Sequence, residues 1–516
     1  MRRIGIDVGG TNTDAVLIEE GKVVRAVKAP TSEDVTTGIL DSLKSLGSTG
    51  VLQGKKIDGV MIGTTHFINA VVQRRSLTKV AALRLGMPAS ASLPPFCDWP
   101  EDLAALVRGG VWMVEGGHEY DGRLFMPLDE AAVTKAAGEM KAAGLKSVGI
   151  SAIFSPLDPG HERRAAELVS KIIPDAVITC SSDLGRIGLL ERENAGLLNA
   201  ALADLARDTI AAFEKAIADS GIAAPLFITQ NDGTVAEAAQ ARRLPVYSFA
   251  SGATNSMRGA AYLSGLSDAM VIDVGGTTTD VGQLKHGFPR EANSVVKVGG
   301  VRTLFRMPDL LSIGLGGGSH VQLASEQGPL KVGPVSVGYR LLKEGIAFGG
   351  RQLTTTDIAV ATGVLELGDQ KKVAHLDAAT CKRVFAEAAR MAEEAIDRMK
   401  TEAGDVPLIA VGGGAFLIPE KLPGVSKVIH VEHGDCANAV GAAIAQVSGE
   451  CDQIFKDLSR AEALSAAQGI ANDRAVAAGA ARASLATIES EDMPLAYLPG
   501  NSVRVRVRVV GDVAAG

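Results

Sequence analysis

A nine-residue motif occurs twice in this chain, and the two copies lie just over half a chain length apart. Residues 6–14 read Ile-Asp-Val-Gly-Gly-Thr-Asn-Thr-Asp, and residues 272–280 differ only in having Thr278 where the first copy has Asn12. In each copy an apolar strand runs into an acid, two glycines, hydroxyl side chains and a second acid. A repeat of this kind predicts two structurally related halves.

The chemistry of the motif favours a site for anionic oxygens. Consecutive glycines let a ligand approach main-chain N–H groups without an intervening Cβ, and N–H groups together with threonine hydroxyls form an anion-binding nest. The acid that ends the strand can hold a hydrated Mg2+ or orient a nucleophile. One such segment is also typical of a plain hairpin turn, but two near-identical copies favour a nucleotide clamped between two related domains.

Composition limits the partners that we expect. At 516 residues, two or three domains are expected, and the net charge of −7 argues against nucleic acid as the main partner. The sequence has no run of about 18 apolar residues and no charged-then-apolar amino terminus, so we expect neither a membrane span nor a signal peptide. Scattered cysteines without a Cys-x-x-Cys pair predict buried thiols in a cytoplasmic protein. They are Cys97, Cys180, Cys381, Cys436 and Cys451.

Strands and helices alternate along the chain, which predicts an α/β fold. We expect a first domain at residues 1–205, with an inserted, loop-rich lobe at about 85–127. A second domain is expected at residues 206–450, and a small extension at residues 451–516.

The expected C-terminal extension has two distinct patterns. Residues 458–488 are rich in alanine and predict one helix. Residues 502–510 alternate valine and arginine with a period of two, which predicts a strand with one solvent-exposed face.

Two common nucleotide motifs fail in this sequence. A Walker A loop fails at residues 50–56, where a second lysine takes the Ser/Thr position. The glycines at 314–318 lack the third glycine and the long preceding strand of a dinucleotide-binding motif. Instead, the two acidic turns, followed by the strand 408–411 that ends in three glycines, resemble the acetate and sugar kinase/chaperone ATPase/actin superfamily.

This resemblance implies two related actin/hexokinase-like ATPase domains around a nucleotide cleft. Asp7 and Asp273 are then the catalytic and metal-binding acids. One would hold a metal-bound water and the other would orient a nucleophile, with either assignment open. Asp14 and Asp280 are expected to cap turns or bind backbone N–H groups. The implied nucleotide-binding residues are Gly9, Gly10, Thr11, Asn12, Gly275, Gly276, Thr277, Thr278, Gly316, Gly317, Gly412, Gly413 and Gly414.

Further segments resemble the hydantoinase/oxoprolinase group and the related acetone carboxylases. In chain order they are Gly63-Thr64-Thr65 with Asn69-Ala70, Glu191-Arg192-Glu193-Asn194 with Asn199-Ala200, Gln230-Asn231-Asp232-Gly233, Ser251-Gly252, the second acidic turn, residues 313–319 and residues 354–357. The resemblance spans about residues 3–450. It departs from the family pattern at Ala253, where members usually have proline, and at Leu311, where they often have a histidine that here follows the turn as His320.

The family resemblance implies an ATP-dependent amidohydrolase subunit. Its reaction would open a cyclic amide or imide, such as a hydantoin, oxoproline or a lactam, through phosphorylation of the amide oxygen. The implied cofactors are ATP and Mg2+, with Mn2+ as the other metal. The implied partners are the small-molecule cyclic amide and a second hydrolase subunit, in an oligomer. A small-molecule kinase and an ATP-driven partner-binding switch are the alternatives.

The remaining candidates are substrate-side residues. Thr64, Thr65 and His66 follow a predicted strand, at the edge where α/β proteins bind ligands. A threonine pair there is equally typical of a helix cap. His66 and His320 are acid–base or metal-ligand candidates by position, against a purely structural role. Glu191 and Glu193 flank Arg192 on a predicted helix, and this pattern is typical of a solvated, charged turn of that helix.

Overall fold

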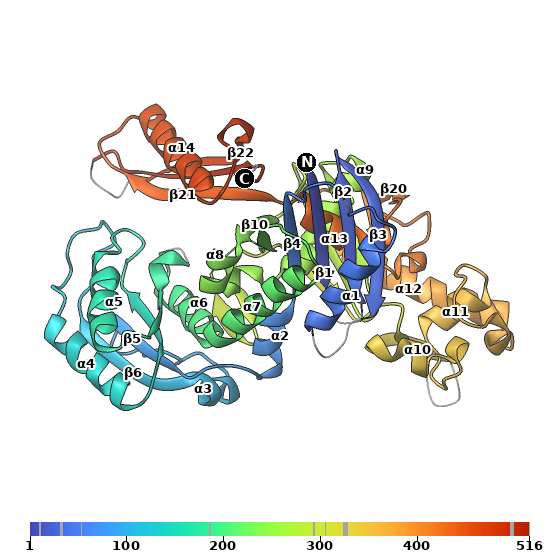
Figure 1. Cartoon of the computed structure of the whole chain (residues 1–516), viewed down its shortest axis with the longest axis horizontal. Coiled ribbons are helices and arrows are strands. Elements are labelled where there is room, and N and C mark those ends of the chain that lie inside the picture. Colours follow the sequence, from blue (N-terminus) through green and yellow to red (C-terminus); the bar gives the residue numbers. More distant parts are fainter. Residues whose placement is uncertain are drawn as a thin grey trace.

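The computed structural model describes residues 1–9, 12–30, 35–52, 54–184, 187–292, 295–304, 306–323, 329–495 and 500–514. It confirms the α/β class. The chain forms a nine-stranded sheet, a six-stranded sheet and a four-stranded sheet, with helices packed between and beside them (Figure 1). Two small two-stranded ladders complete the strand pairing.

The nine-stranded sheet contains the first copy of the motif. Its order is β22-β23-β21-β10-β9-β4-β1-β2-β3. The strands are β1 (Arg2–Val8), β2 (Asn12–Glu19), β3 (Lys22–Pro30), β4 (Gly59–Thr64), β9 (Leu226–Thr229), β10 (Thr234–Glu237), β21 (Gln446–Phe455), β22 (Ala486–Pro494) and β23 (Val503–Gly511). Apolar side chains of β1, β2, β4 and β9 pack against α1 (Val35–Gly47) and α7 (Ala203–Asp219), which forms one of the main cores.

The six-stranded sheet contains the second copy. Its path is β13-β12-β11-β19-β20, and β16 pairs with β12 beside this path. The strands are β11 (Ala269–Val274), β12 (Thr279–Lys285), β13 (Phe288–Pro289), β16 (Leu310–Ile313), β19 (Val406–Val411) and β20 (Val425–His430). The long helix α12 (Ala378–Met399) buries Val384, Ala388 and Ile396 against this sheet.

The two copies of the motif fold into the same hairpin. In β1–β2, Asp7 lies opposite Asp14, and in β11–β12, Asp273 lies opposite Asp280. In both hairpins the first strand also pairs in parallel with a later strand, β4 or β19. The equal register shows that the sequence repeat is a structural repeat.

Two helices that are rich in small residues lie between the sheets. α9 (Ser251–Ser264) and α13 (Ala437–Ile444) cross in close contact, and α13 also packs on β1. A Cβ on Gly259 would overlap the carbonyl oxygen of Ala437, and one on Gly441 would overlap that of Asn255. A Cβ on Gly5 of β1 would likewise overlap the carbonyl oxygen of Ala439. Because these three positions lack side chains, the two helices and β1 can pack in close contact.

A four-stranded parallel sheet forms a lobe beside the first sheet. Its order is β6-β5-β7-β8, and residues 85–127 contribute β6, α3 and most of the connection to α4. The segment is therefore only partly loop. Its elements are β5 (Val80–Met87), α3 (Glu101–Val107), β6 (Arg108–Glu115), α4 (Glu130–Ala142), β7 (Ser147–Ala152), α5 (Gly160–Ile172), β8 (Val177–Cys180) and α6 (Leu189–Ala201). The expected domain limits at residues 205 and 450 stay predictions.

The predicted helix at residues 191–193 is confirmed, but the expected solvation of Arg192 and Glu193 is wrong. Arg192 and Glu193 lie inside α6 and are buried. Glu193 accepts a hydrogen bond from Nε of the buried Arg84 at 2.7 Å, and Arg192 donates to Ser181 Oγ at 2.9 Å. The sequence suggested solvation because the hydrogen-bond partners of Arg192 and Glu193 come from other segments of the lobe, which the charge pattern itself does not reveal.

The C-terminal unit is a helix on three strands. α14 (Arg460–Ala477) is shorter than the expected helix at 458–488, because the chain turns at Gly479, which has φ +99°, and then forms β22. Val505, Val507 and Val509 of β23 bury against alanines of α14. β21 joins the unit to the first sheet through its parallel pairing with β10.

The arginine face of β23 is not a solvent-exposed face as expected. Arg506 and Arg508 lie in a largely buried charge network that also contains Arg306, Asp232, Glu291, Glu450 and Glu489. Arg506 Nη2 and Arg306 Nη1 both lie 2.8 Å from Glu291 carboxylate oxygens. Burial would raise the pKa of Glu291, but the three arginines hold it below its ordinary value. The period-two pattern predicted the strand correctly but not the acids opposite it.

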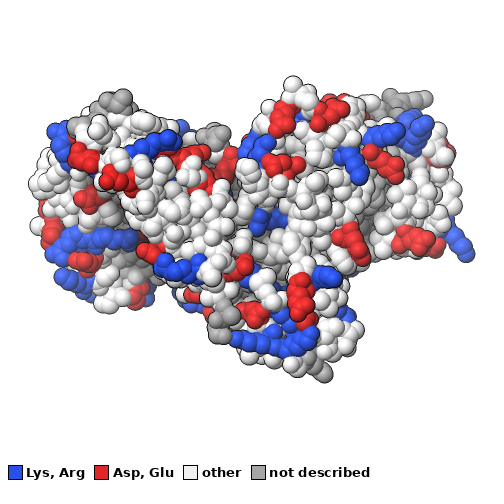
Figure 2. All heavy atoms as spheres, turned by 90° about the horizontal axis from the view of Figure 1, so that it is seen from above, with Lys and Arg blue, Asp and Glu red and all other residues white. Residues whose placement is uncertain are grey.

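The other described elements surround these sheets. They are α2 (His66–Gln73), α8 (Ala238–Arg243), β14 (Val296–Val298), β15 (Val301–Thr303), β17 (Ser319–Gln322), β18 (Lys331–Ser336), α10 (Leu341–Glu344) and α11 (Thr355–Ala361). Figure 2 shows acidic and basic side chains interspersed over one face of the molecule. Within the described ranges, no helix is long and apolar enough to cross a bilayer. Four cysteines are buried as expected, but Cys97 is exposed.

Candidate active site

Asp7 is a buried acid with one oxygen that has no partner. Its residue is only 5% exposed. Oδ2 accepts a hydrogen bond from Nδ2 of Asn438 at 2.8 Å, whereas Oδ1 has no hydrogen-bond partner among the residues that the structure describes. A Cβ on Gly63 of β4 would lie 2.7 Å from Oδ1, so the neighbouring strand reaches this acid closely only because position 63 is glycine.

The electrostatics of the two repeated acids differ from those of exposed carboxylates. Burial raises the pKa of Asp7 to about 7, with further contributions from the charges of Asp14 and Asp273. Burial also raises the pKa of Asp273 to about 6, against a hydrogen bond from Ser256 that lowers it. Asp7 and Asp273 therefore interact electrostatically, and both would be stabilised in their ionised form by a nearby cation.

The second acids of the hairpins have different partners. Asp14 forms an ion pair with Lys28 Nζ at 2.7 Å, and Asp280 accepts a hydrogen bond from the Ser312 hydroxyl. Burial raises the pKa of both acids, in each case against these partners. Their described partners are thus side chains rather than the backbone N–H groups that the sequence suggested.

The first acidic turn is described in part. Gly9 N donates to Asn12 O at 3.1 Å, which closes the turn between β1 and β2. Gly10 and Thr11 lie outside the described residues. Gly9 and Asn12 are half-buried, so the described ends of the turn are partly accessible.

The second acidic turn is hydrogen-bonded to the glycine-rich turn at residues 314–318. Gly275 N donates to Thr278 O at 2.9 Å, as in the first hairpin. Gly317 N and Gly318 N donate to the carbonyls of Gly275 and Gly276 at 3.0 and 2.8 Å. Thr277 and Thr278 are exposed at its tip.

The glycine-rich turn at 314–318 therefore supports the second acidic turn. Gly316 N donates to Ser319 Oγ at 2.9 Å, so the N–H groups of both Gly316 and Gly317 already have partners. Thr356 Oγ1 in turn donates to the carbonyl of Gly317 at 2.8 Å. These contacts favour a shaping role for the two glycines over direct donation to a ligand.

The three glycines after β19 lie directly against the second hairpin. Gly412 has φ +88°, and a Cβ there would overlap Asp273 Oδ1 and the carbonyl of Val274. Gly414 N donates to Val274 O at 2.7 Å. A Cβ on Gly413 would meet nothing within 4 Å, so Gly413 faces open space beside the second turn.

The end of β4 lies beside Asp7. Thr64 is buried and its Oγ1 accepts from His66 N at 3.1 Å, while Thr65 makes no side-chain cap hydrogen bond to α2. Ser251 Oγ donates to the carbonyl of Thr64 at 3.3 Å, which joins this strand end to α9. His66 is half-buried, and burial lowers its pKa. Thr64 and Thr65 thus lie next to the strand segment of Asp7, and His66 follows them at the start of α2.

His320 lies elsewhere. It is a half-exposed residue of β17 whose backbone bridges to Thr354, next to the glycine-rich turn. Among the described residues, no hydrogen bond or ion pair links its side chain to either repeated acid. His320 stays a prediction without a described contact to the site.

Three residues that contact the site were missed in the sequence. Asn438 of α13 donates to Asp7, Ser256 of α9 donates to Asp273, and Lys28 pairs with Asp14. The two central helices thus each supply one hydrogen-bond donor to one acid. Asn438 is the second residue of α13, and its partner lies 431 residues away in the chain. Only its place in the fold reveals the contact.

Comparison with known families agrees with this geometry. Residues 3–173 match the hydantoinase/oxoprolinase N-terminal region, and residues 192–406 match hydantoinase/oxoprolinase. The chain belongs to the hydantoinase/oxoprolinase family. Both hairpins and the described strand end at Thr64 fall within the matched residues of this family.

Relatives of this hydantoinase/oxoprolinase chain include subunits of three named enzymes. Caprolactamase subunit alpha of Pseudomonas jessenii is 29% identical over 396 residues, which cover 71% of this chain and 55% of the relative. Acetophenone carboxylase gamma subunit of Aromatoleum aromaticum is 24% identical over a match that covers 70% of this chain and 53% of the relative. Acetone carboxylase beta subunit of Xanthobacter autotrophicus is 25% identical and covers 70% and 54%. The chain spans about half the length of the curated relatives it matches.

Two solved structures share the fold over the whole chain. The ATP-dependent caprolactamase from Pseudomonas jessenii has a TM-score of 0.78 at 20% identity and covers 99% of this chain and 88% of that one. Nucleotide-free acetone carboxylase has a TM-score of 0.71 at 17% identity, over a match that covers 100% of this chain and 89% of that one. At these identities the likeness shows the fold of this family member.

Proposed function

We propose that this protein is the nucleotide-binding subunit of an ATP-dependent enzyme that opens a cyclic amide through phosphorylation of the amide oxygen. The observation that most supports this is the pair of hairpins in equal register, whose acids Asp7 and Asp273 are electrostatically coupled and have raised pKa values. Family membership and the caprolactamase relative favour a cyclic amide as the substrate class.

Mg2+ fits the site as an ion held mainly by water and phosphate oxygens. Within the described ranges, no group of three or more His, Cys, Asp or Glu side chains could form a metal cage. Mg2+ commonly takes only one or two protein carboxylates and keeps several waters. Asp7 and Asp273 would supply these carboxylates, and the unpartnered Oδ1 of Asp7 suits the ion or one of its waters. Mn2+ would use the same oxygen ligands.

The nucleotide would lie across the two hairpins. Gly9 and Asn12, with Gly10 and Thr11, would contact the phosphates on one side, and Gly275 to Thr278 on the other. The open space at Gly413 suits the nucleoside, with Gly412 and Gly414 fixing the strand end. Gly316 and Gly317 would hold the second turn in shape.

The chemistry explains why a nucleotide is needed. Amide resonance makes the carbonyl carbon a poor electrophile, and ATP supplies a phosphoryl group that removes this resonance when it is transferred to the oxygen. The protein contributes positioning and charge stabilisation. Asp7 and Asp273 fix the charges, while Thr64, Thr65 and His66 would hold the substrate carbonyl beside them. Because burial lowers its pKa, His66 would be neutral, and its one ring N–H could donate to the carbonyl oxygen.

The partner proposal rests on the relatives, which are named as subunits. We propose that a second, hydrolytic subunit completes the enzyme in an oligomer and that the complex is cytoplasmic. A carboxylase is the second candidate, because two relatives are carboxylase subunits and a ketone, like an amide, has a carbonyl oxygen that ATP can activate.

The decisive test follows an oxygen label. A hydantoin, oxoproline or lactam labelled with heavy oxygen in its carbonyl is incubated with Mg-ATP, this protein and the subunit encoded beside it. We expect ring-opened product in step with ADP and phosphate, and the label in the phosphate. Label retained in a stable phosphorylated product would indicate a kinase, and substrate-independent, partner-stimulated ATP turnover would indicate a switch. Ring opening that needs no nucleotide would refute the mechanism.

A further inference from the structure

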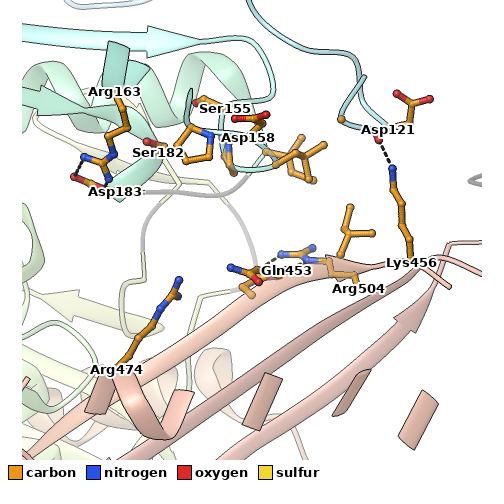
Figure 3. Close-up of a pocket in the computed structure, with 17 residues that line it drawn as sticks. Asp121, Ser155, Asp158, Arg163, Ser182, Asp183, Gln453, Lys456, Arg474 and Arg504 are labelled. Carbon is orange, nitrogen blue, oxygen red and sulfur yellow. Dashed lines mark hydrogen bonds and ion pairs between the residues drawn. The ribbon is translucent and has the colours of Figure 1, made fainter. Parts of the chain in front are cut away.

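A cavity lies between the C-terminal unit and the lobe, away from the two hairpins. Its volume is about 550 Å³, which is within the range of small-molecule sites. One wall is formed by β21, β23 and α14, and the other by the entry to α5 and the turn after β8 (Figure 3). Neither Asp7 nor Asp273 lines it, so it is not part of the site described above.

Three of the four described carboxylates that line this cavity are paired with arginines, and the fourth, Asp158, is bound by a backbone N–H and lies near a histidine. Asp452 pairs with Arg504, whose Nε and Nη2 donate at 2.7 and 2.6 Å, and Asp183 pairs with Arg163. Asp121 is held by its neighbour Arg123 at 2.6 Å. Asp158 Oδ1 accepts from the N–H of Gly160 at 2.8 Å, and its Oδ2 lies 3.4 Å from His118 Nε2.

Two cations of the cavity wall have no such partner. Lys456 donates to the backbone carbonyl of Asp121 at 2.5 Å, and Arg474 donates to that of Glu450 at 2.7 Å. Neither forms a salt bridge with a carboxylate in the described part of the chain. In Figure 3 both side chains extend from the C-terminal wall toward the lobe. The cavity therefore has positive charge in excess of its paired groups.

The opposite wall carries two hydroxyls without partners. Ser155 is fully buried, and among the described residues neither its Oγ nor that of Ser182 has a hydrogen-bond partner. Both residues line the cavity. Leaving a buried polar group unsatisfied is costly, so two such groups beside one cavity call for a polar partner, which an ordered water or an oxygen of a bound molecule can supply.

We propose that this cavity binds a small organic carboxylate, with Arg474 and Lys456 holding the anionic oxygens and Ser155 and Ser182 donating to them. Arginine and lysine bind carboxylates through short, charge-assisted hydrogen bonds. The role rests on the proposed function: opening a cyclic amide releases a carboxylate, so the site would hold the ring-opened product or a carboxylate-bearing substrate.

The position of the cavity fits that role. A second cavity of about 690 Å³ shares Ser182, Asp183, Asp452 and Arg474 with it and extends to Asn231. The side chain of Asn231 accepts from Ala250 N at 2.7 Å, directly before the Ser251–Gly252 pair that begins α9. A Cβ on Gly252 would lie 3.8 Å from Asp7 Oδ1. The carboxylate site thus adjoins a hollow that extends to the helix beside the proposed reaction centre.

The test is a calorimetric titration of the full chain with butyrate, glutarate and glutamate, and with inorganic phosphate for comparison. We expect saturable binding of at least one carboxylate in the millimolar range. Arg474→Gln and Lys456→Gln should each weaken it by roughly tenfold, which corresponds to one charge-assisted hydrogen bond. Arg482→Gln is the matched control, because Arg482 is exposed, pairs with Asp473 and does not line the cavity.

Ser155→Ala separates binding from folding. Because the Ser155 hydroxyl has no partner among the described residues, the variant should unfold at the same temperature as wild type or higher, yet bind the carboxylate several-fold more weakly. No carboxylate binding, unchanged binding in both charge variants, or tighter binding of phosphate than of every carboxylate would overturn the proposal. A thermal shift by Mg-ATP in the same samples tests the proposed function separately, since the two ligands occupy different sites.

Discussion

At the scale of single residues, the surroundings of Asp7 satisfy one of its carboxylate oxygens and leave the other without a described partner. One carboxylate oxygen accepts from Asn438, while the other is buried without a partner next to two further acids. The raised pKa of about 7 means that the ionised form of this side chain destabilises the free protein. A group retained under such conditions is a candidate for function rather than for stability.

We therefore predict opposite effects of Asp7→Asn on stability and activity. A carboxylate with a raised folded pKa stabilises the fold fully below its unfolded value, and this contribution is lost as pH rises through about 7. Without nucleotide, Asp7→Asn should thus be more stable than wild type by about 1–3 kcal/mol near pH ~8, with a smaller gain near pH ~5. Mg-ATP turnover should fall by about a hundredfold or more.

Urea denaturation at the two pH values, with a coupled ADP assay, measures both effects. Asp41→Asn, on the exposed side of α1, is the control and should change neither. An Asp7→Asn protein that is destabilised at alkaline pH would contradict the burial-based explanation.

Adjacent glycines after β19 offer a second prediction at this scale. Gly412→Ala places a Cβ against Asp273 Oδ1 at φ +88° and should cost about 2–4 kcal/mol. Gly413→Ala meets open space and should leave stability within about 0.5 kcal/mol, but weaken Mg-ATP binding if the nucleoside lies there. Denaturation and nucleotide titration of both variants check this. Equal stability losses would show that the strand end is tight at both positions.

At the scale of elements, the two hairpins depend on the two helices between them. α9 supplies Ser256 to Asp273, and α13 supplies Asn438 to Asp7. The helices can approach each other and β1 because glycine and alanine occupy the crossing. The same small residues therefore set the spacing of the helices and the positions of the acid-holding side chains.

We predict that Gly441→Ala disrupts this crossing. Its Cβ would overlap the backbone carbonyl of Asn255, which cannot move without shifting α9, and overpacking of this kind should cost about 2–3 kcal/mol or more. Gly469→Ala in α14 is the matched control, because its Cβ meets nothing within 4 Å. It should stabilise the protein by about 0.5–1 kcal/mol through higher helix propensity. Equilibrium unfolding distinguishes the two, and a neutral Gly441→Ala would mean that the helices can separate freely.

At the scale of the whole molecule, the C-terminal unit is attached in two ways. β21 continues the first sheet through β10, and the arginines of β23 enter the charge network with Glu291 and Arg306, which belong to the segment after the second hairpin. The network thus connects the C-terminal unit to both halves. Removing one member of such a partly buried network leaves charges without partners.

Arg508→Gln should therefore destabilise the protein by about 3 kcal/mol, because Asp232, Glu291 and Glu489 would each lose a cationic partner. Arg504→Gln is the control on the same strand. Its side chain is 30% exposed, against 7% for Arg508, and among the described residues its ion pair is with Asp452. Its loss should be within about 1 kcal/mol. Urea unfolding of both variants measures the difference, and equal losses would refute a buried network.

The sequence alone determined the local parts of the site. The repeated acid–glycine–glycine turn predicted two related hairpins, and their register follows because strand and turn residues lie within a few positions of one another. The triple-glycine strand end and the valine periodicity of β23 were predicted for the same reason. Each pattern reports on the backbone geometry of its own segment.

Only the tertiary structure decided which distant groups meet. It brought Asn438 to Asp7, opposed acids to Arg506 and Arg508, buried Arg192 and Glu193 in the lobe, and ended α14 at Ala477. Hydrogen bonds and ion pairs act over a few ångströms, so a pair hundreds of residues apart leaves no periodic trace in either segment. Backbone propensity is local and readable in the chain, whereas burial and partner choice belong to the packed molecule.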